Sequence, residues 1–249
     1  MGKQISQISF IRKIIIKHNT KKTIKICRLL SVSKSASVET FGFYNDHICL
    51  LQPGIDLEKF EFNSNARIRI REDLSIPEDA VVFGDFGRLC EEKNQMFLLK
   101  LFKKYQTFNR NSFLVLVGLS ENNYKNQLVQ YCNNNKISNV IILDPKSDIN
   151  EYYSAIDVFF TPSLREGFGL VVIEAQTSGC FTLAFDEVIE KNLLINKNAY
   201  LVQNDLEKSY KILISNDVQK REYDATKLAK FDIRKSSTLF RNLVIGIDK

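Results

Sequence analysis

The sequence lacks the features that mark several classes of protein. No apolar run reaches the roughly 18 residues that a membrane-spanning helix needs. The five cysteines are scattered without a C-x-x-C pair or other metal-type spacing, which favours free thiols in a reducing compartment. The amino-terminal residues show no apolar core followed by a small-residue cleavage site, as a secretory signal would. We therefore expect a cytoplasmic protein that is not an integral membrane protein and has no metal site.

Acidic residues are absent from residues 1–38, which hold nine of the 35 Lys and Arg residues. The remaining chain has a net charge of −3, although the whole chain has +6. Four isoleucines within 1–20 recur at helical spacing, so this basic segment is either a solvated helix that packs through them or a peripheral contact with an anionic membrane at its inner face. Phe10 is the only aromatic residue among the nine cations, and no nucleic-acid motif is present. We expect no nucleic-acid partner.

Strand-like and helix-like stretches alternate through the rest of the 249 residues. Of these residues 44% are apolar and 26% charged, as in a globular domain with a buried core. We expect helices at 95–105 after an Asn94 cap, at 121–135, at 148–156 after an Asp148 cap, at 170–178 and twice beyond 205, and strands near 48–52, 81–89, 113–118, 139–143, 157–163, 181–185 and 199–202. This order predicts an α/β fold with a single Rossmann-like parallel sheet and helices on both faces.

In such a sheet, ligands bind beyond the carboxyl ends of the strands. The stretch "SLREGFGLVVIEAQTSGC" (163–180) follows one of these ends. Its "EGFG" loop opens a helix whose unpaired N–H groups and dipole favour an anion, and Gly179 is placed to end that helix. Glu166 could simply cap the helix. Glu174 lies among aliphatic residues, where a carboxylate needs hydrogen-bond donors, and the vicinal hydroxyls of a sugar or ribose would supply them.

A second loop, "GRLCEEKN" (87–94), places Arg88 and Lys93 between a strand and a helix. Two cations on such a loop suit a diphosphate. Taken alone, the pair is weak evidence, because Arg and Lys are common as ordinary surface charge. Together with the two glutamates it describes a nucleotide-sugar site, in which cations and helix N–H groups hold phosphates and carboxylates hold hydroxyls.

These residues resemble a known family. Glu166 and Glu174, with seven residues between them, match the E-x7-E motif of the retaining GT-B glycosyltransferases of group 1. "GRLCEEKN" resembles the family's G-R-L…E-K-N/G segment, "LLQPGIDLEKF" its N-G-[IV]-D…F turn, and "SVSKSA" a segment near its interdomain crossing. The motifs occur in family-like order over about residues 30–249. The sequence thus resembles the C-terminal, donor-binding half of a GT-B fold.

The resemblance implies a role for each site residue. Arg88 and Lys93 would contact the donor diphosphate, and Glu174 the ribose hydroxyls. Glu166 would be the catalytic residue that faces the transferred sugar. The implied donor-binding set is Arg88, Lys93, Gly167, Phe168, Gly169, Leu170 and Glu174. The resemblance implies no metal and no cofactor, because cations and the helix dipole would stabilise the leaving nucleoside diphosphate. A UDP-sugar is the favoured donor.

The resemblance also implies a function and a domain division. The function would be transfer of a hexosyl unit from a nucleoside diphosphate sugar to a saccharide or lipid-linked acceptor in surface polysaccharide synthesis. Residues 1–38 would be a basic remnant of an N-terminal domain, and 39–249 the nucleotide-sugar-binding domain with its C-terminal helices. The alternative is a non-catalytic nucleotide-sugar-binding subunit, or a truncated remnant, that needs a partner subunit for the acceptor. In either case the chain could also form a homo-oligomer.

Overall fold

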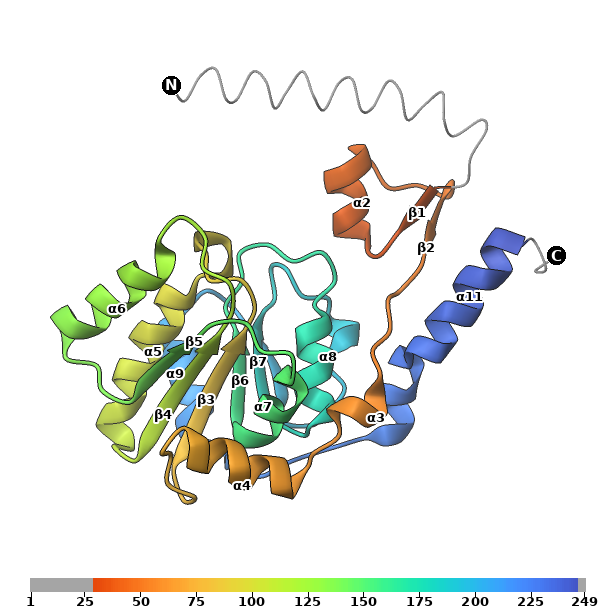
Figure 1. Cartoon of the computed structure of the whole chain (residues 1–249). Coiled ribbons are helices and arrows are strands. Elements are labelled where there is room, and N and C mark those ends of the chain that lie inside the picture. Colours follow the sequence, from red (N-terminus) through yellow and green to blue (C-terminus); the bar gives the residue numbers. More distant parts are fainter. Residues whose placement is uncertain (1–28, 246–249) are drawn as a thin grey trace, which may run out of the picture. The chain divides into compact units, whose positions relative to one another are not determined.

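The computed structural model describes residues 29–245 and divides the chain into two compact units. The small unit contains 29–54 and 233–245, and the large unit contains 55–232 (Figure 1). The isoleucines of residues 1–20, with the expected membrane contact, lie outside the described residues. The domain boundary expected after residue 38 stays a prediction.

The large unit is built on one six-stranded sheet in which every neighbouring pair is parallel. Its strands are β3 (Val81–Phe86), β4 (Ser112–Val117), β5 (Val140–Leu143), β6 (Val158–Thr161), β7 (Phe181–Phe185) and β8 (Ala199–Val202). The spatial order is β5-β4-β3-β6-β7-β8, so the order reverses between β3 and β6. The predicted Rossmann-like sheet is confirmed. Its switch point, where such sheets bind ligands, lies where β3 and β6 end.

Helices cover both faces of this sheet (Figure 1). They are α3 (Leu57–Phe60), α4 (Ser64–Asp73), α5 (Gln95–Phe108), α6 (Tyr124–Asn135), α7 (Ile149–Ala155), α8 (Leu170–Thr177), α9 (Leu206–Ile214) and α10 (Ala225–Leu228), with the 3-10 turns η1 (Glu91–Lys93), η2 (Lys191–Leu193) and η3 (Ala229–Phe231). Side chains alternate along each strand. Phe83 and Phe160 pack with α5, α6 and α9, whereas Val82 and Phe159 pack with α4, α7 and α8.

A buried ion-pair cluster fixes α4 to the sheet. Both oxygens of Asp157 accept from arginines of α4, Oδ1 from Arg67 at 2.7 Å and Oδ2 from Arg71 at 2.8 Å. The backbone N–H of Val82 also donates to Asp157 Oδ2 at 2.8 Å. Asp157 is 2% exposed, so its charge is offset by these donors and not by water. The cluster joins α4, β3 and β6 at the amino ends of the central strands.

The helix termini agree with the sequence in position and differ in detail. Gly179 follows α8 with φ +77°, as predicted for a glycine that ends a helix. Asn94 and Asp148 directly precede α5 and α7, but neither side chain makes a capping hydrogen bond. Asn94 has φ +52° instead, a left-handed conformation that asparagine tolerates well. The chain therefore reverses at Asn94 through its backbone.

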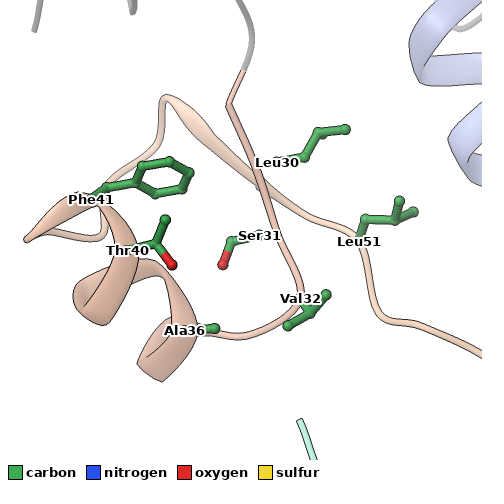
Figure 2. Close-up of a pocket in the computed structure, with 7 residues that line it drawn as sticks. All are labelled: Leu30, Ser31, Val32, Ala36, Thr40, Phe41 and Leu51. Carbon is green, nitrogen blue, oxygen red and sulfur yellow. The ribbon is translucent and has the colours of Figure 1, made fainter. Parts of the chain in front are cut away.

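The small unit contains a two-stranded parallel sheet. Strands β1 (Leu29–Ser31) and β2 (Ile48–Leu50) are joined by α2 (Lys34–Phe41), and α11 (Ile233–Ile245) belongs to the same unit. Ser33 caps α2 through a hydrogen bond from the Ala36 N–H at 3.0 Å. Figure 2 shows an apolar pocket of about 270 Å³ in this unit, lined by Leu30, Ser31, Val32, Ala36, Thr40, Phe41 and Leu51. Across 29–245, no helix is long and apolar enough to cross a membrane.

Candidate functional site

The loops that follow β3 and β4 touch backbone to backbone. A Cβ atom on Gly118 would lie 1.6 Å from the carbonyl oxygen of Gly87, so only glycine fits at position 118. The Gly87 N–H in turn donates to the Val117 carbonyl at 2.9 Å. The loops after β3 and β4 are therefore held together by direct backbone contact.

A pocket of about 270 Å³ opens at this end of the sheet. It is lined by Phe86, Gly87, Val117, Gly118, Leu119, Pro145, Lys146, Ile149, Tyr153 and Glu174. Most of these residues are apolar, while Glu174 and Lys146 bring one charge of each sign. A mostly apolar hollow with a few polar groups is typical of a small-molecule site.

Glu174 lies on α8, as predicted, and has a partner within the protein. The Tyr153 hydroxyl donates to Glu174 Oε2 at 2.7 Å. Ligand hydroxyls are therefore not the only donors that this carboxylate has within reach. Burial raises the pKa of Glu174, and the hydrogen bond from Tyr153 opposes that rise. Burial and the adjacent Glu174 charge raise the pKa of Tyr153 well above its usual value, so the tyrosine stays a donor.

Lys93 and Glu166 form an ion pair between η1 and the loop after β6. Their side chains are only 17% and 10% exposed. Ser163 donates to Glu166 Oε1 at 2.9 Å and is itself within 2.9 Å of the Thr161 hydroxyl. The structure thus joins two residues that the sequence assigns to different parts of the donor, and it orients Glu166 through a chain of hydroxyl groups.

Further contacts connect the same two loops. The Leu164 N–H donates to the Glu92 carbonyl at 2.8 Å, and Arg165 pairs with the Glu92 carboxylate at 3.1 Å. Arg88 is 51% exposed and pairs with Glu121 at 2.7 Å and with Glu92 at 3.5 Å. Exposed pairs of this kind are weak, so the Arg88 guanidinium can exchange partners at little cost.

The glycine-rich loop turns into α8 as the sequence predicts. Gly169 has φ +99°, a backbone conformation that favours glycine, and a Cβ there would also displace Ile189 Cδ1, which would lie 2.5 Å away. No side chain among the described residues caps α8. Leu170 is the first residue of the helix, and Phe168 packs edge-on against Phe231 at 6.4 Å between ring centroids. The backbone around Gly167 therefore leads directly into a helix N-terminus, which attracts anions.

Sequence reasoning missed three residues at this site. Tyr153 gives no signal in the sequence, because its role depends on α7 packing against α8. Lys146 lines the pocket, but a lysine in a loop gives no signal of its own in the sequence. Asp85 did give a signal, since it interrupts the otherwise apolar strand "VVFGDF". It is 3% exposed and lies in β3, the strand that leads into the loop with Lys93.

Comparison with known proteins identifies the family. The family model described as "Glycosyl transferases group 1" matches residues 66–224. This chain belongs to that family. It is 31% identical over 194 residues to EpsF of Bacillus subtilis, and 31% identical over 165 residues to UDP-Gal:alpha-D-GlcNAc-diphosphoundecaprenol alpha-1,3-galactosyltransferase of Escherichia coli.

The fold agrees with solved glycosyltransferases of the GT-B type. The structure of HepE from Anabaena in complex with UDP superposes with a TM-score of 0.79 at 19% identity, over 94% of this chain and 68% of HepE. The matches cover 74% of this chain and 47% of EpsF, and 64% of this chain and 40% of the Escherichia coli enzyme. The chain thus spans less than half the length of these curated relatives. It corresponds to the C-terminal half of a GT-B glycosyltransferase, as the motifs predicted.

Proposed function

We propose that the crevice at the ends of β3 and β6 binds a nucleoside diphosphate sugar and that this chain takes part in retaining hexosyl transfer. One observation carries the proposal: the two motif glutamates lie at the switch point in different surroundings. Glu174 lines the pocket, whereas Glu166 pairs with Lys93. The HepE complex with UDP and the Escherichia coli enzyme, named for a UDP-sugar donor and a lipid-linked acceptor, support a UDP-sugar and an acceptor of that class.

The pocket would take the nucleoside. Its apolar lining, including Phe86 and Ile149, suits a flat base, and Glu174 would accept hydrogen bonds from the ribose hydroxyls. An ionised carboxylate offers about four lone-pair positions, of which Tyr153 uses one. Tyr153 would therefore orient Glu174 and leave acceptor positions of the carboxylate free for the ribose hydroxyls.

The ion-paired loops would take the phosphates. Lys93 would be shared between Glu166 and the diphosphate, and the exposed Arg88 would turn from its glutamate partners to the ligand. The amino end of α8 adds the positive end of its dipole. These groups would offset the charge that the diphosphate gains as the bond to the sugar breaks.

The reaction would replace one bond of the anomeric carbon by another on the same face of the sugar. The bond to the diphosphate oxygen breaks, and the acceptor hydroxyl oxygen forms a new bond to that carbon. The hydroxyl proton passes to the leaving diphosphate. Glu166, oriented by Ser163 and Lys93, would face the sugar during this exchange. The protein's part is thus to position the donor and to stabilise the leaving group.

A ligand panel tests the nucleoside part of the proposal. UDP-, GDP- and ADP-sugars are screened by thermal shift and calorimetry, and the best binder is used in a transfer assay. Glu174→Ala should weaken that binder by about 2–4 kcal/mol, because hydrogen bonds to a charged group are lost. Glu78→Ala, an exposed glutamate just before β3, is the matched control. If no sugar nucleotide binds the wild type, or if both variants bind equally well, the proposal is wrong.

The cations are tested by comparing ligands with and without phosphate. Arg88→Ala and Lys93→Ala should each weaken nucleoside diphosphates much more than nucleosides. Lys100→Ala, an exposed lysine on α5, serves as control. EDTA should leave binding intact, as expected for a site whose cations are side chains. Equal losses for both kinds of ligand would show that Arg88 and Lys93 support the fold and not the phosphates.

A second candidate is a subunit that binds the nucleotide sugar without transferring it. It rests on the match to EpsF, which covers 47% of that protein, and on the proposed site, whose residues all contact the donor side. The transfer assay separates the two: binding with no transfer to any saccharide or lipid-linked acceptor supports the subunit, and turnover supports the enzyme.

A further inference from the structure

A buried polar pair adjoins the loop 87–94, which would bind the phosphates, and the proposed function assigns it no role. Asp85, in β3, is 3% exposed, and Gln95, the first residue of α5, is 0% exposed. Gln95 Nε2 donates to Asp85 Oδ2 and to the Arg88 carbonyl oxygen, each at 3.0 Å. One amide group thus connects the strand, the loop after it and the helix that follows the loop.

The two bonds define how the Gln95 amide is oriented. A reversed amide would place Oε1 against the same carbonyl of Arg88, where two acceptors would repel. In the observed orientation Oε1 is buried and has no hydrogen-bond partner among the described residues. An unsatisfied buried acceptor is unfavourable and calls for an explanation. The two bonds from Nε2 set the orientation of the amide, which links β3 to the segment 87–94.

The neighbours of Asp85 are the proposed phosphate and sugar contacts. Lys93 on η1 attracts its charge, and Glu166 on the loop after β6 repels it. Two phenols also lie within its electrostatic reach: burial and, to a smaller extent, the charge of Asp85 raise the pKa of Tyr124 on α6 and of Tyr153 on α7. Burial raises the pKa of Asp85 to about 7, so near neutral pH its charge responds to small changes at Lys93.

We propose that Asp85 and Gln95 position the phosphate-binding segment 87–94, and that the negative charge of Asp85 opposes donor binding. Gln95 acts on the segment through the Arg88 carbonyl. A bound diphosphate draws on Lys93 and adds negative charge nearby, which favours the protonated form of Asp85. By linkage, donor binding takes up a proton, and donor affinity falls as the pH rises through neutrality. This inference rests on the proposed function, because it assumes that the ligand is a nucleoside diphosphate sugar.

The charge is tested with UDP-glucose first, or with the GDP- or ADP-glucose that binds best. The diphosphate of a sugar nucleotide carries no proton to release between pH 6 and pH 8, so it does not add its own pH dependence. Wild-type affinity should fall by about three- to tenfold over this range, the effect of a coupling of up to about one pKa unit. Asp85→Asn keeps an acceptor for Gln95 and should flatten the profile. A profile as steep as that of the wild type would overturn the role of the charge.

The positioning role is tested with Asp85→Leu combined with Gln95→Leu. Replacing both partners by apolar groups of similar size should leave the fold intact, as the melting temperature will show. The double variant should lose about tenfold in affinity for the sugar nucleotide, keep its affinity for the free nucleoside, and exchange amide hydrogens faster at 87–94. If the wild type binds no sugar nucleotide, the proposed function fails, but amide hydrogen exchange still tests the positioning role. Equal exchange rates at 87–94 in the wild type and the double variant would overturn that role, and faster exchange in the variant would support it.

Discussion

The two units cover their parallel sheets very differently. In the large unit every residue of β3, β6 and β7 is buried, with helices on both faces. In the small unit β1 and β2 are each buried at one residue and half-buried at the other two, and the pocket of Figure 2 opens against them. Parallel sheets are normally covered on both faces.

The difference explains where the site lies. A closed core fixes side chains in single positions, so the large unit can hold polar groups such as Asp85 and Glu174 at defined places. The small unit has no strand that is buried along its whole length among the described residues, and Val38 and Tyr44 within it are 53% and 40% exposed. A site that must hold its side chains in defined positions needs a closed core such as that of the large unit. The same substitution made in both units measures how far their packing differs.

The largest difference is expected for phenylalanine. Phe159→Ala should lower the free energy of unfolding by about 3–5 kcal/mol, because Phe159 is 0% exposed and its removal leaves a cavity. Phe41→Ala, at a half-buried position of the small unit, should cost less than about 1 kcal/mol, since little area is removed from water. Urea unfolding measures both. Equal costs would mean that the small unit is packed as tightly as the large one.

The next largest effect concerns buried charge. With its pKa raised to about 7, Asp85 contributes stability that is fully present below its unfolded value of 3.8 and is lost as the pH rises through 7. Asp85→Asn should therefore raise the stability at pH 8 by about 2–4 kcal/mol and change it much less at pH 4. Asp46→Asn, at an exposed position of the small unit, is the control. Melting curves at the two pH values decide the matter, and a variant that is no more stable at pH 8 than the wild type would contradict the prediction.

The sequence was sufficient for the sheet and for the position of α8 after the strand β6. The apolar run at 113–117 and its counterparts could only be buried strands, and the glycines at 169 and 179 marked the ends of α8 correctly. Pairings between distant side chains could not be predicted. Lys93 meets Glu166 across 73 positions, and Tyr153 meets Glu174 across 21. Such contacts depend on how loops and helices pack on the sheet, which hydrophobic periodicity does not specify.

The smallest effect is expected for the hydrogen bond by which Tyr153 would orient the Glu174 carboxylate. Tyr153→Phe removes only the hydroxyl that donates to Glu174 Oε2, and the ring can keep its contacts with Phe86 and Phe159. Without that bond Glu174 is more mobile and its pKa is higher, because the bond lowers it. Binding of the sugar nucleotide should weaken by about 0.5–1.5 kcal/mol, the usual net value of one hydrogen bond, and more at pH 6 than at pH 8.

The matched control is Tyr44→Phe in the small unit, where the ring is 40% exposed. It should change neither the affinity nor its pH dependence. Calorimetry at the two pH values distinguishes the variants. If Tyr153→Phe binds the donor as tightly as the wild type at both, the tyrosine only fills space in the core. Glu174 would then owe its position to α8 alone, and the closed packing of the large unit would matter for its stability and not for its site.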